Sequence, residues 1–446
     1  MTIVKVMLGL GLGLALMLGI ALCSYKPPRV PEQTLYRPAG GAGTSVPSGS
    51  ATSPDVANQI DYGLAFVEFD DEGSLADRAQ LALLLADLRA RTARADTTIL
   101  LYVHGWNHNA GIHDSNVACF NELLKATAIM QAGYKSEDQR TPRAVYGIYV
   151  GWPGVVYDND KLNTALTFFG RQSAADRIGD RGALLTLFSD IGEIRNLRNR
   201  TRTKFVIVAH SLGARMTYKA LRPIMQRAAY ETRTDQSSFV ADVAVMVNPA
   251  LSADEHTERA ALIAAQAAQG SAGDTPAFVI ATSKDDEVLG GIFPWSQKVA
   301  SFVRGDYTFA NRRRAAPVGL YDEYVTHTLD LEGVYENSPG GNGCPTLNHK
   351  ELEIVKGKNR TVSAEELYDY RLIKHYDVAN HETYRTVLTE RDGRGNGSIM
   401  VVEVSGQIIP NHNDIFTSPF TDFLSRVINA GLYRPRHSQP VLQRRE

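Results

Sequence analysis

Residues 205–215, "FVIVAHSLGAR", decide both the fold and the chemistry of this chain. Five apolar residues run into a His, a Ser and a Leu-Gly pair that begins a helical pattern. A serine at a sharp turn between a buried strand and a helix has its hydroxyl exposed as a nucleophile. Such a turn requires small residues two positions away, and Ala209 and Gly213 are both small. The alternative is that Ser211 only caps an ordinary helix, so the rest of the chain must decide between them.

The remainder of the chain alternates short apolar runs with helical patterns. Continuous apolar runs are typical of strands that are covered on both faces. Apolar residues at three- and four-residue spacing predict helices at 75–93 and 212–231. The alternation predicts an α/β fold with a mostly parallel, doubly wound sheet and helices on both faces. The predicted strands are 62–69, 97–104, 144–151, 204–210, 242–248, 277–283 and 399–406.

Composition excludes some classes of function. The 446 residues include 47 Lys+Arg and 49 Asp+Glu, so the formal charge is 47 − 49 = −2, which gives no reason to expect a nucleic-acid partner. The three cysteines are too few for a disulfide framework and have no zinc-site spacing. A single Cys119–Cys344 bridge is compatible with an oxidising compartment, but the sequence does not determine whether it forms.

The N-terminal part predicts attachment to a membrane or export. The apolar run Val6–Cys23 carries no charge and is near the minimum length of a membrane span. Residues 1–23 therefore form an anchor, a cleaved signal peptide, or a segment lipidated on Cys23, although the preceding Leu22 disfavours lipidation. Residues 24–59 hold six prolines and four glycines and are predicted to be a disordered tether. We expect a bacterial cell-envelope protein, membrane-anchored or exported, with its catalytic part outside the cytoplasm.

The globular body is predicted to span residues 60–435. The interval between the strands at 277–283 and 399–406 is far longer than a crossover connection needs. Residues of about 295–397 are therefore predicted to form an insertion before the last strand.

A nucleophilic serine needs a base, and the base needs an orienting carboxylate. In a fold of this kind the chain order is Ser, then Asp or Glu, then His. Asp285, Asp286 and Glu287 follow the strand at 277–283, and all three remain candidates from their position alone. His412 is the histidine between the last strand and a final amphipathic helix, so it is the predicted base.

Acyl transfer also needs donors for the developing oxyanion. We expect one to be the backbone N–H of Leu212, at the start of the helix after Ser211. The other is expected to be the N–H of Trp106, because Gly105 lets the backbone turn after the strand at 97–104. His104, His108 and His113 lie close together and could instead hold a metal ion. The glycine among them indicates a loop, whereas zinc-binding pairs at this spacing belong on a helix.

Eight segments between about residues 95 and 430 resemble a bacterial α/β-hydrolase family of uncharacterised serine esterases or lipases, often envelope-attached. In similar sequences an aromatic-Pro pair closely follows the acid, as Phe293-Pro294 follows Asp286, so the resemblance implies Asp286 as the acid. It also implies Ser211 as nucleophile and His412 as base. The segments are LLYVHGWNHNA, YGIYVGWPG, TFFGRQSAADRIG, VAHSLGAR, VNPAL, TSKDDEVLGGIFP, YVTHTLDL and NHNDIFTSPFTDFL.

Together these observations predict an α/β-hydrolase that cleaves a carboxylic ester or related acyl substrate through a Ser-His-Asp triad and an acyl-enzyme. The expected partners are a small acyl or lipid-like substrate and the membrane, and the reaction needs no cofactor. One alternative is a non-catalytic hydrolase-fold module that binds a partner at the membrane. A second alternative is a metallohydrolase centred on His104 and His108.

Overall fold

The computed structural model places most of the predicted catalytic body. The apolar run at 6–23, all of the tether except 37–39 and much of the interval 295–397 lie outside the described residues. The structure describes residues 37–39, 62–111, 113–133, 143–155, 160–197, 203–230, 240–256, 278–294, 313, 316–333, 344, 384–391 and 399–432.

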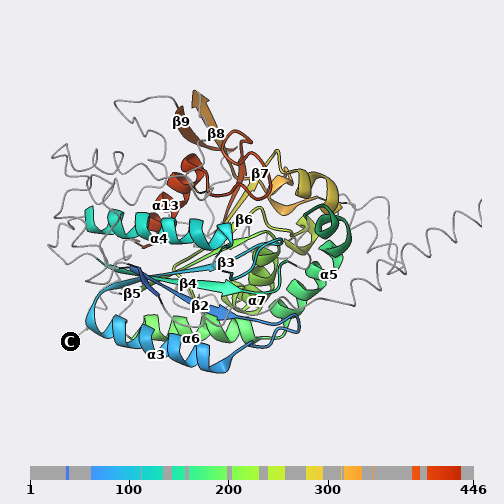
Figure 1. Cartoon of the computed structure of the whole chain (residues 1–446). Coiled ribbons are helices and arrows are strands. Elements are labelled where there is room, and N and C mark those ends of the chain that lie inside the picture. Colours follow the sequence, from blue (N-terminus) through green and yellow to red (C-terminus); the bar gives the residue numbers. More distant parts are fainter. Residues whose placement is uncertain are drawn as a thin grey trace, which may run out of the picture.

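Ten strands of the described ranges form one sheet, in the order β1-β2-β4-β3-β5-β6-β7-β10-β8-β9 (Figure 1). Neighbouring strands are parallel from β2 through to β8, and only the outermost strands, β1 and β9, pair antiparallel. The strands are β1 (Arg37–Ala39), β2 (Tyr62–Glu68), β3 (Thr97–Val103), β4 (Ala144–Gly151), β5 (Thr203–His210), β6 (Val243–Val247), β7 (Phe278–Ser283), β8 (His327–Gly333), β9 (Tyr384–Glu390) and β10 (Ile399–Val404).

Helices cover both faces of this sheet, as Figure 1 shows. On one face, α3 (Arg78–Arg94), α6 (Ala183–Leu197) and α7 (Ser211–Tyr230) share a core with the sheet, and α5 (Asp160–Asp180) packs against α7. On the other face, α4 (Ser115–Gly133) and α13 (Ser418–Leu432) form a second core. The doubly wound arrangement predicted from the sequence is confirmed.

Strand β3 shows why the apolar runs are continuous. All seven of its residues are buried. Ile99 and Leu101 point into the core beneath α3 and α6, whereas Leu100 and Tyr102 point into the core beneath α4. Successive side chains of a strand face opposite sides, so a strand covered on both sides has no polar positions.

Strand order sets the place of the candidate site. From β3 the chain runs outward to β4 on one side and then returns to β5 on the other, so the β3–β5 boundary is a point where the winding reverses. In open α/β sheets, the crevice at the carboxyl ends of strands at such a point is where ligands bind. Val103 ends β3 and His210 ends β5, directly before the predicted nucleophile.

Two parts of the chain differ from the sequence prediction. Within the predicted insertion, β8 pairs parallel with β10 and β9 pairs antiparallel with β8, so this part of the interval extends the sheet rather than lying wholly outside it. The strand β8, "HTLDLEG", alternates polar and apolar residues, which is typical of a half-buried strand and differs from the continuous apolar runs that predicted the others. Within the predicted disordered tether, Arg37–Ala39 form β1 on the edge of β2, because an unpaired edge offers backbone hydrogen bonds to any extended segment.

A disulfide joins Cys119 on α4 to Cys344, 225 residues later in the chain. The bond therefore attaches one point of the predicted insertion to the body of the domain. The sequence left this pairing open.

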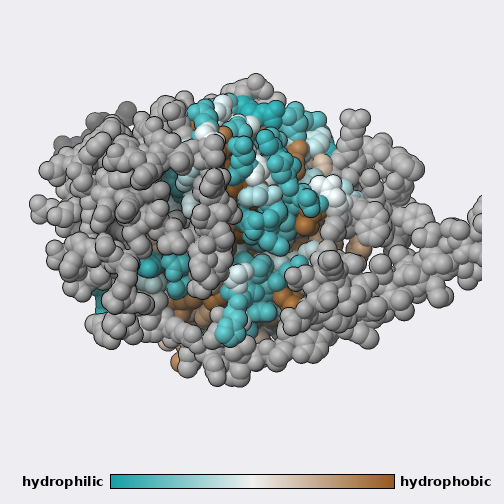
Figure 2. All heavy atoms as spheres, turned by 45° about the horizontal axis from the view of Figure 1, so that its top comes forward, coloured by the Kyte–Doolittle hydropathy of each residue, from teal (hydrophilic) through white to brown (hydrophobic). Residues whose placement is uncertain are grey.

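The described surface is mainly hydrophilic on the face turned forward in Figure 2, with scattered hydrophobic spots. Among the described side chains, the large hydrophobic ones left exposed are Leu83 and Leu197. None of the helices in the described ranges combines the length and the apolar composition that a membrane crossing requires.

Candidate active site

Ser211 occupies a strained turn. It is the first residue of α7, directly after β5, and its backbone φ is 55°, in the left-handed region that costs a non-glycine residue energy. A Cβ at Gly213 would lie 2.3 Å from the carbonyl oxygen of His104 and 2.6 Å from that of Val103. Only glycine therefore lets the first turn of α7 approach the end of β3. Ala209 is fully buried within β5, where its small side chain satisfies the requirement that glycine usually meets.

Three side chains that are far apart in the sequence meet at this turn. The Ser211 hydroxyl lies 2.5 Å from His412 Nε2, and His412 Nδ1 lies 2.6 Å from Asp286 Oδ2. The Asp286 Oδ1 atom accepts a hydrogen bond of 2.9 Å from the Leu289 N–H. Because the carboxylate faces Nδ1, the imidazole proton is held there and the Nε2 lone pair faces the hydroxyl. This arrangement can transfer the serine proton to His412.

The acidic residue beside His412 is Asp286, as the resemblance implied. Asp286 is 2% exposed and comes directly after the turn that follows β7. Asp285 and Glu287 are exposed instead, and the Asp285 carboxylate lies against Gly406. Of the three acids left open by position, only Asp286 contacts His412.

Two polar residues that the sequence analysis missed hold the His412 backbone. His210 Nε2 donates a hydrogen bond of 2.9 Å to the His412 carbonyl, and Asn248 Nδ2 donates one of 3.1 Å to the same oxygen. Asn248 Oδ1 accepts from the Ser283 N–H at 2.9 Å, which links the ends of β6 and β7. Each residue follows a buried apolar run at a strand end, and this was the only available signal.

His210 also has an electrostatic consequence for the site. Its ring centroid lies 5.1 Å from that of His412. Burial, together with the nearby His412, holds the pKa of His210 well below its ordinary value. The His210 ring is therefore neutral and adds no positive charge beside an imidazole that must itself become charged.

The predicted oxyanion donors lie on two segments beside Ser211. Leu212 is buried in the first turn of α7, where backbone N–H groups have no partner within the helix. In the loop after β3, a Cβ at Gly105 would lie 2.5 Å from His210 Nδ1 and 2.9 Å from Ser211 Cβ. The residue next to Trp106 is therefore in close contact with the serine, and this contact also explains the glycine.

The histidines of the metal hypothesis are used differently. His104 Nδ1 donates to the Gly105 carbonyl at 2.8 Å, and its Nε2 accepts from the Trp152 N–H at 3.1 Å. Burial lowers the pKa of His104 to about 4, so its ring is neutral. Both nitrogens of His108 are also hydrogen-bonded, to Asp114 and Asn116, and His113 is exposed. Among the described residues, no three His, Cys, Asp or Glu side chains form a group that could hold a metal ion.

Comparison with protein families agrees with the fold described above. Residues 84–292 match the model of a family described as alpha/beta hydrolase of unknown function (DUF900). The chain carries an α/β-hydrolase domain. The match includes Ser211 and Asp286, whereas His412 lies beyond it. Comparison with curated proteins gives no significant match. The α/β-hydrolase fold predicted from the sequence is confirmed.

Proposed function

We propose that the hydrolase domain is a serine hydrolase that cleaves carboxylic esters or related acyl substrates through an acyl-enzyme. One observation carries the proposal: Ser211, His412 and Asp286 form a continuous hydrogen-bonded series with distances of 2.5 and 2.6 Å. The strained backbone at Ser211 adds support, because such strain is characteristic of nucleophile turns.

The first half of the reaction forms the acyl-enzyme. The Ser211 Oγ attacks the carbonyl carbon of the ester while His412 Nε2 takes the hydroxyl proton. The carbonyl oxygen becomes an oxyanion, which the N–H groups of Trp106 and Leu212 stabilise. As the C–O bond of the ester breaks, His412 gives its proton to the departing alcohol. Throughout, Asp286 accepts the hydrogen bond from His412 Nδ1 and so holds the imidazole in place.

The second half releases the acid. Water attacks the carbonyl of the acyl-Ser211 ester, and His412 Nε2 takes one of its protons. The tetrahedral intermediate collapses, the bond to Ser211 Oγ breaks, and His412 returns the proton to that oxygen. The products are a carboxylic acid and the free hydroxyl of Ser211.

Hydrolysis of p-nitrophenyl acetate, butyrate, octanoate and palmitate tests the proposal and reports the preferred acyl length. The purified chain is expected to turn over at least one ester, and Ser211→Ala and His412→Ala to lower kcat by about 10⁴-fold or more. The matched controls are Ser189→Ala and His113→Asn, because both side chains are exposed. A folded protein that hydrolyses none of these esters would favour the alternative of a non-catalytic module that binds a partner.

We further propose that the protein works in an oxidising part of the cell envelope, attached or exported through residues 1–23. The Cys119–Cys344 disulfide supports this location, because disulfides persist in oxidising compartments. The test is alkylation in freshly broken cells under denaturing conditions, because both cysteines are buried in the folded protein. Cys119 and Cys344 are expected to react only after reduction, whereas immediate labelling of both would contradict the proposed location.

A further inference from the structure

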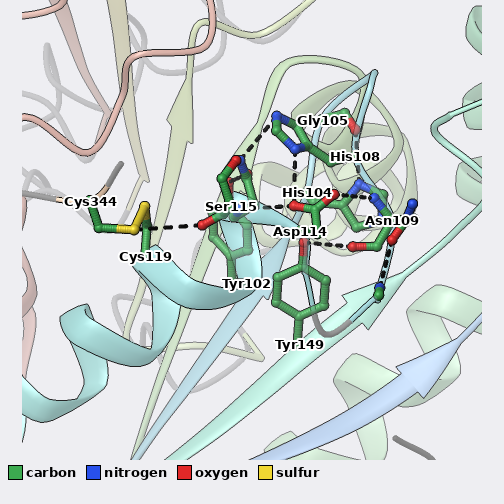
Figure 3. A network of polar contacts seen from close by, with 12 residues as sticks. Tyr102, His104, Gly105, His108, Asn109, Asp114, Ser115, Cys119, Tyr149 and Cys344 are labelled. Atoms are coloured by element: carbon green, nitrogen blue, oxygen red, sulfur yellow. Dashed lines mark hydrogen bonds and ion pairs between the residues drawn. A yellow bond between two sulfur atoms is a disulfide. The ribbon is translucent and has the colours of Figure 1, made fainter. Parts of the chain in front are cut away.

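The loop between β3 and α4 is tied down by a buried polar network (Figure 3). The Tyr102 hydroxyl donates to Asn116 Oδ1 at 2.5 Å, and Asn116 Nδ2 lies 3.0 Å from His108 Nε2. His108 Nδ1 lies 3.0 Å from Asp114 Oδ1. Because Asn116 Oδ1 accepts from Tyr102, its amide nitrogen faces His108. His108 Nε2 must then accept, and the His108 proton is on Nδ1, directed at Asp114.

Asp114 is the residue on which this network converges. Its Oδ2 accepts from the Asn109 N–H at 2.9 Å, and its Oδ1 accepts from the Asn116 N–H at 2.8 Å. Burial alone would raise the pKa of Asp114, but the hydrogen bond with His108 and the Asn109 N–H outweigh it and lower the pKa. Asp114 is therefore a carboxylate that joins the start of α4 to two points of the loop.

The loop held by this carboxylate is in close contact with other segments on two sides. On one side, a Cβ at Gly154 would lie 2.4 Å from the His108 carbonyl oxygen and 2.9 Å from that of Gly105. The Asn107 N–H also donates to the Gly154 carbonyl at 3.2 Å. On the other side, Gly105 is in contact with Ser211. A displacement at His108 would therefore be transmitted to Gly105 and to the residues that face the nucleophile.

We propose that Asp114 and His108 are positioning residues for the oxyanion site: they hold the 105–109 loop so that the Trp106 N–H faces the developing oxyanion. This inference rests on the proposed serine-hydrolase function. His108 is not a second general base, because both of its ring nitrogens are engaged in the network. Oxyanion donors act only when they are fixed before the charge develops, so loosening the loop should affect the transition state more than substrate binding.

Two amide substitutions of His108 separate the two hydrogen bonds of its ring. His108→Asn places an amide N–H near the position of Nδ1 and so keeps a donor to Asp114. His108→Gln instead places its amide near the position of Nε2 and so loses that donor. Asp114→Asn removes the charge and one acceptor. The matched control is Asp242→Asn, because Asp242 also accepts a backbone N–H, from Phe205, and pairs with cations. It directly precedes β6, at the amino ends of the strands and so away from the site.

The measurements are kcat and KM on the preferred p-nitrophenyl ester, the affinity of a trifluoromethyl ketone that forms a tetrahedral adduct, and the melting temperature. Asp114→Asn and His108→Gln are expected to lower kcat by roughly 10- to 100-fold, with KM changed by less than about threefold. The affinity of the ketone should fall in parallel with kcat. His108→Asn should retain more activity than His108→Gln, and Asp242→Asn should lower the melting temperature without lowering kcat.

The proposal is overturned if Asp114→Asn keeps the kcat and ketone affinity of the wild type. It is equally overturned if Asp242→Asn and Asp114→Asn lose kcat in the same proportion to their loss of melting temperature, because the loss of activity would then only reflect lower stability. It is also overturned if His108→Asn is no better than His108→Gln. If the wild-type protein itself neither hydrolyses esters nor reacts with a fluorophosphonate, the proposed function fails and the positioning role fails with it. The two kinds of failure are distinguishable, because the variant results that overturn the positioning role are measured against a wild-type protein that is active.

Discussion

Protonation of His104 is expected to destabilise the folded protein at mildly acidic pH. The ring is stacked between Tyr149 and Trp152 and accepts a hydrogen bond from the Trp152 N–H, so the folded state has no place for a second ring proton. Burial lowers the pKa of His104 from 6.5 to about 4. Between these two values the unfolded chain binds a proton that the folded chain does not. The contribution of neutral His104 to the free energy of unfolding is therefore fully present above the pKa of 6.5 that the histidine has in the unfolded chain, and it is lost as the pH falls toward 4.

The size of the effect follows from the two pKa values. The difference, 6.5 − 4 = 2.5, corresponds to about 3 kcal/mol once the pH is below both values. At pH of about 5 only part of this is realised, about 2 kcal/mol relative to pH of about 7.5. Because the pKa of His210 is also lowered in the folded state, its protonation in the unfolded chain likewise lowers the free energy of unfolding as the pH falls.

Urea unfolding of the wild type and of His104→Asn, at pH of about 7.5 and of about 5, measures this contribution. The asparagine keeps a donor near the position of Nδ1 for the Gly105 carbonyl but does not titrate. The wild type is expected to lose about 2 kcal/mol more than His104→Asn on acidification. His113→Asn, which removes an exposed histidine, should lose as much as the wild type. Equal losses in the wild type and His104→Asn would show that His104 does not cause the loss of stability at acidic pH.

Three further changes test other parts of the fold. Gly213→Ala places a Cβ 2.3 Å from the His104 carbonyl oxygen, so it should lower the unfolding free energy by about 2 kcal/mol or more and abolish ester hydrolysis. In the control Gly290→Ala the new Cβ meets nothing within 4 Å, so urea unfolding should be nearly unchanged. Ser211→Gly should be more stable than Ser211→Ala by about 1 kcal/mol, because glycine relieves the positive φ; equal urea midpoints would argue against strain there. Cys344→Ser opens a loop of 225 residues and should lower stability by up to about 5 kcal/mol, and a wild-type melting temperature unchanged by reductant would contradict this.

Much of the fold could be predicted from the sequence, because the patterns that indicate its central strands are local in the chain. Buried parallel strands need continuous apolar runs, and β3, β4 and β5 were found from them to within one residue at each end. The positions of Ser211 and His412 followed from chain order, since this fold places its working residues at strand ends.

The missing parts depend on contacts between distant segments. His210 and Asn248 bind the carbonyl of a residue 202 and 164 positions further along, and no local pattern encodes that partner. Position in the chain likewise does not decide between Asp286 and Asp285, because that choice depends on which carboxylate the turn after β7 directs inward; here only the family resemblance pointed to Asp286. β8 and β9 do not follow from continuous apolar runs, because strands near the edge of a sheet carry polar residues among the apolar ones.

The central claim is that Ser211 is a nucleophile activated by His412. Reaction of the purified chain with a fluorophosphonate, followed by intact-mass measurement and peptide mapping, tests it most directly. We expect one adduct, located on Ser211, that is absent in Ser211→Ala, forms far more slowly in His412→Ala, and forms normally in Ser189→Ala. A folded wild-type protein that acquires no adduct, or an adduct that persists unchanged in Ser211→Ala, would contradict it.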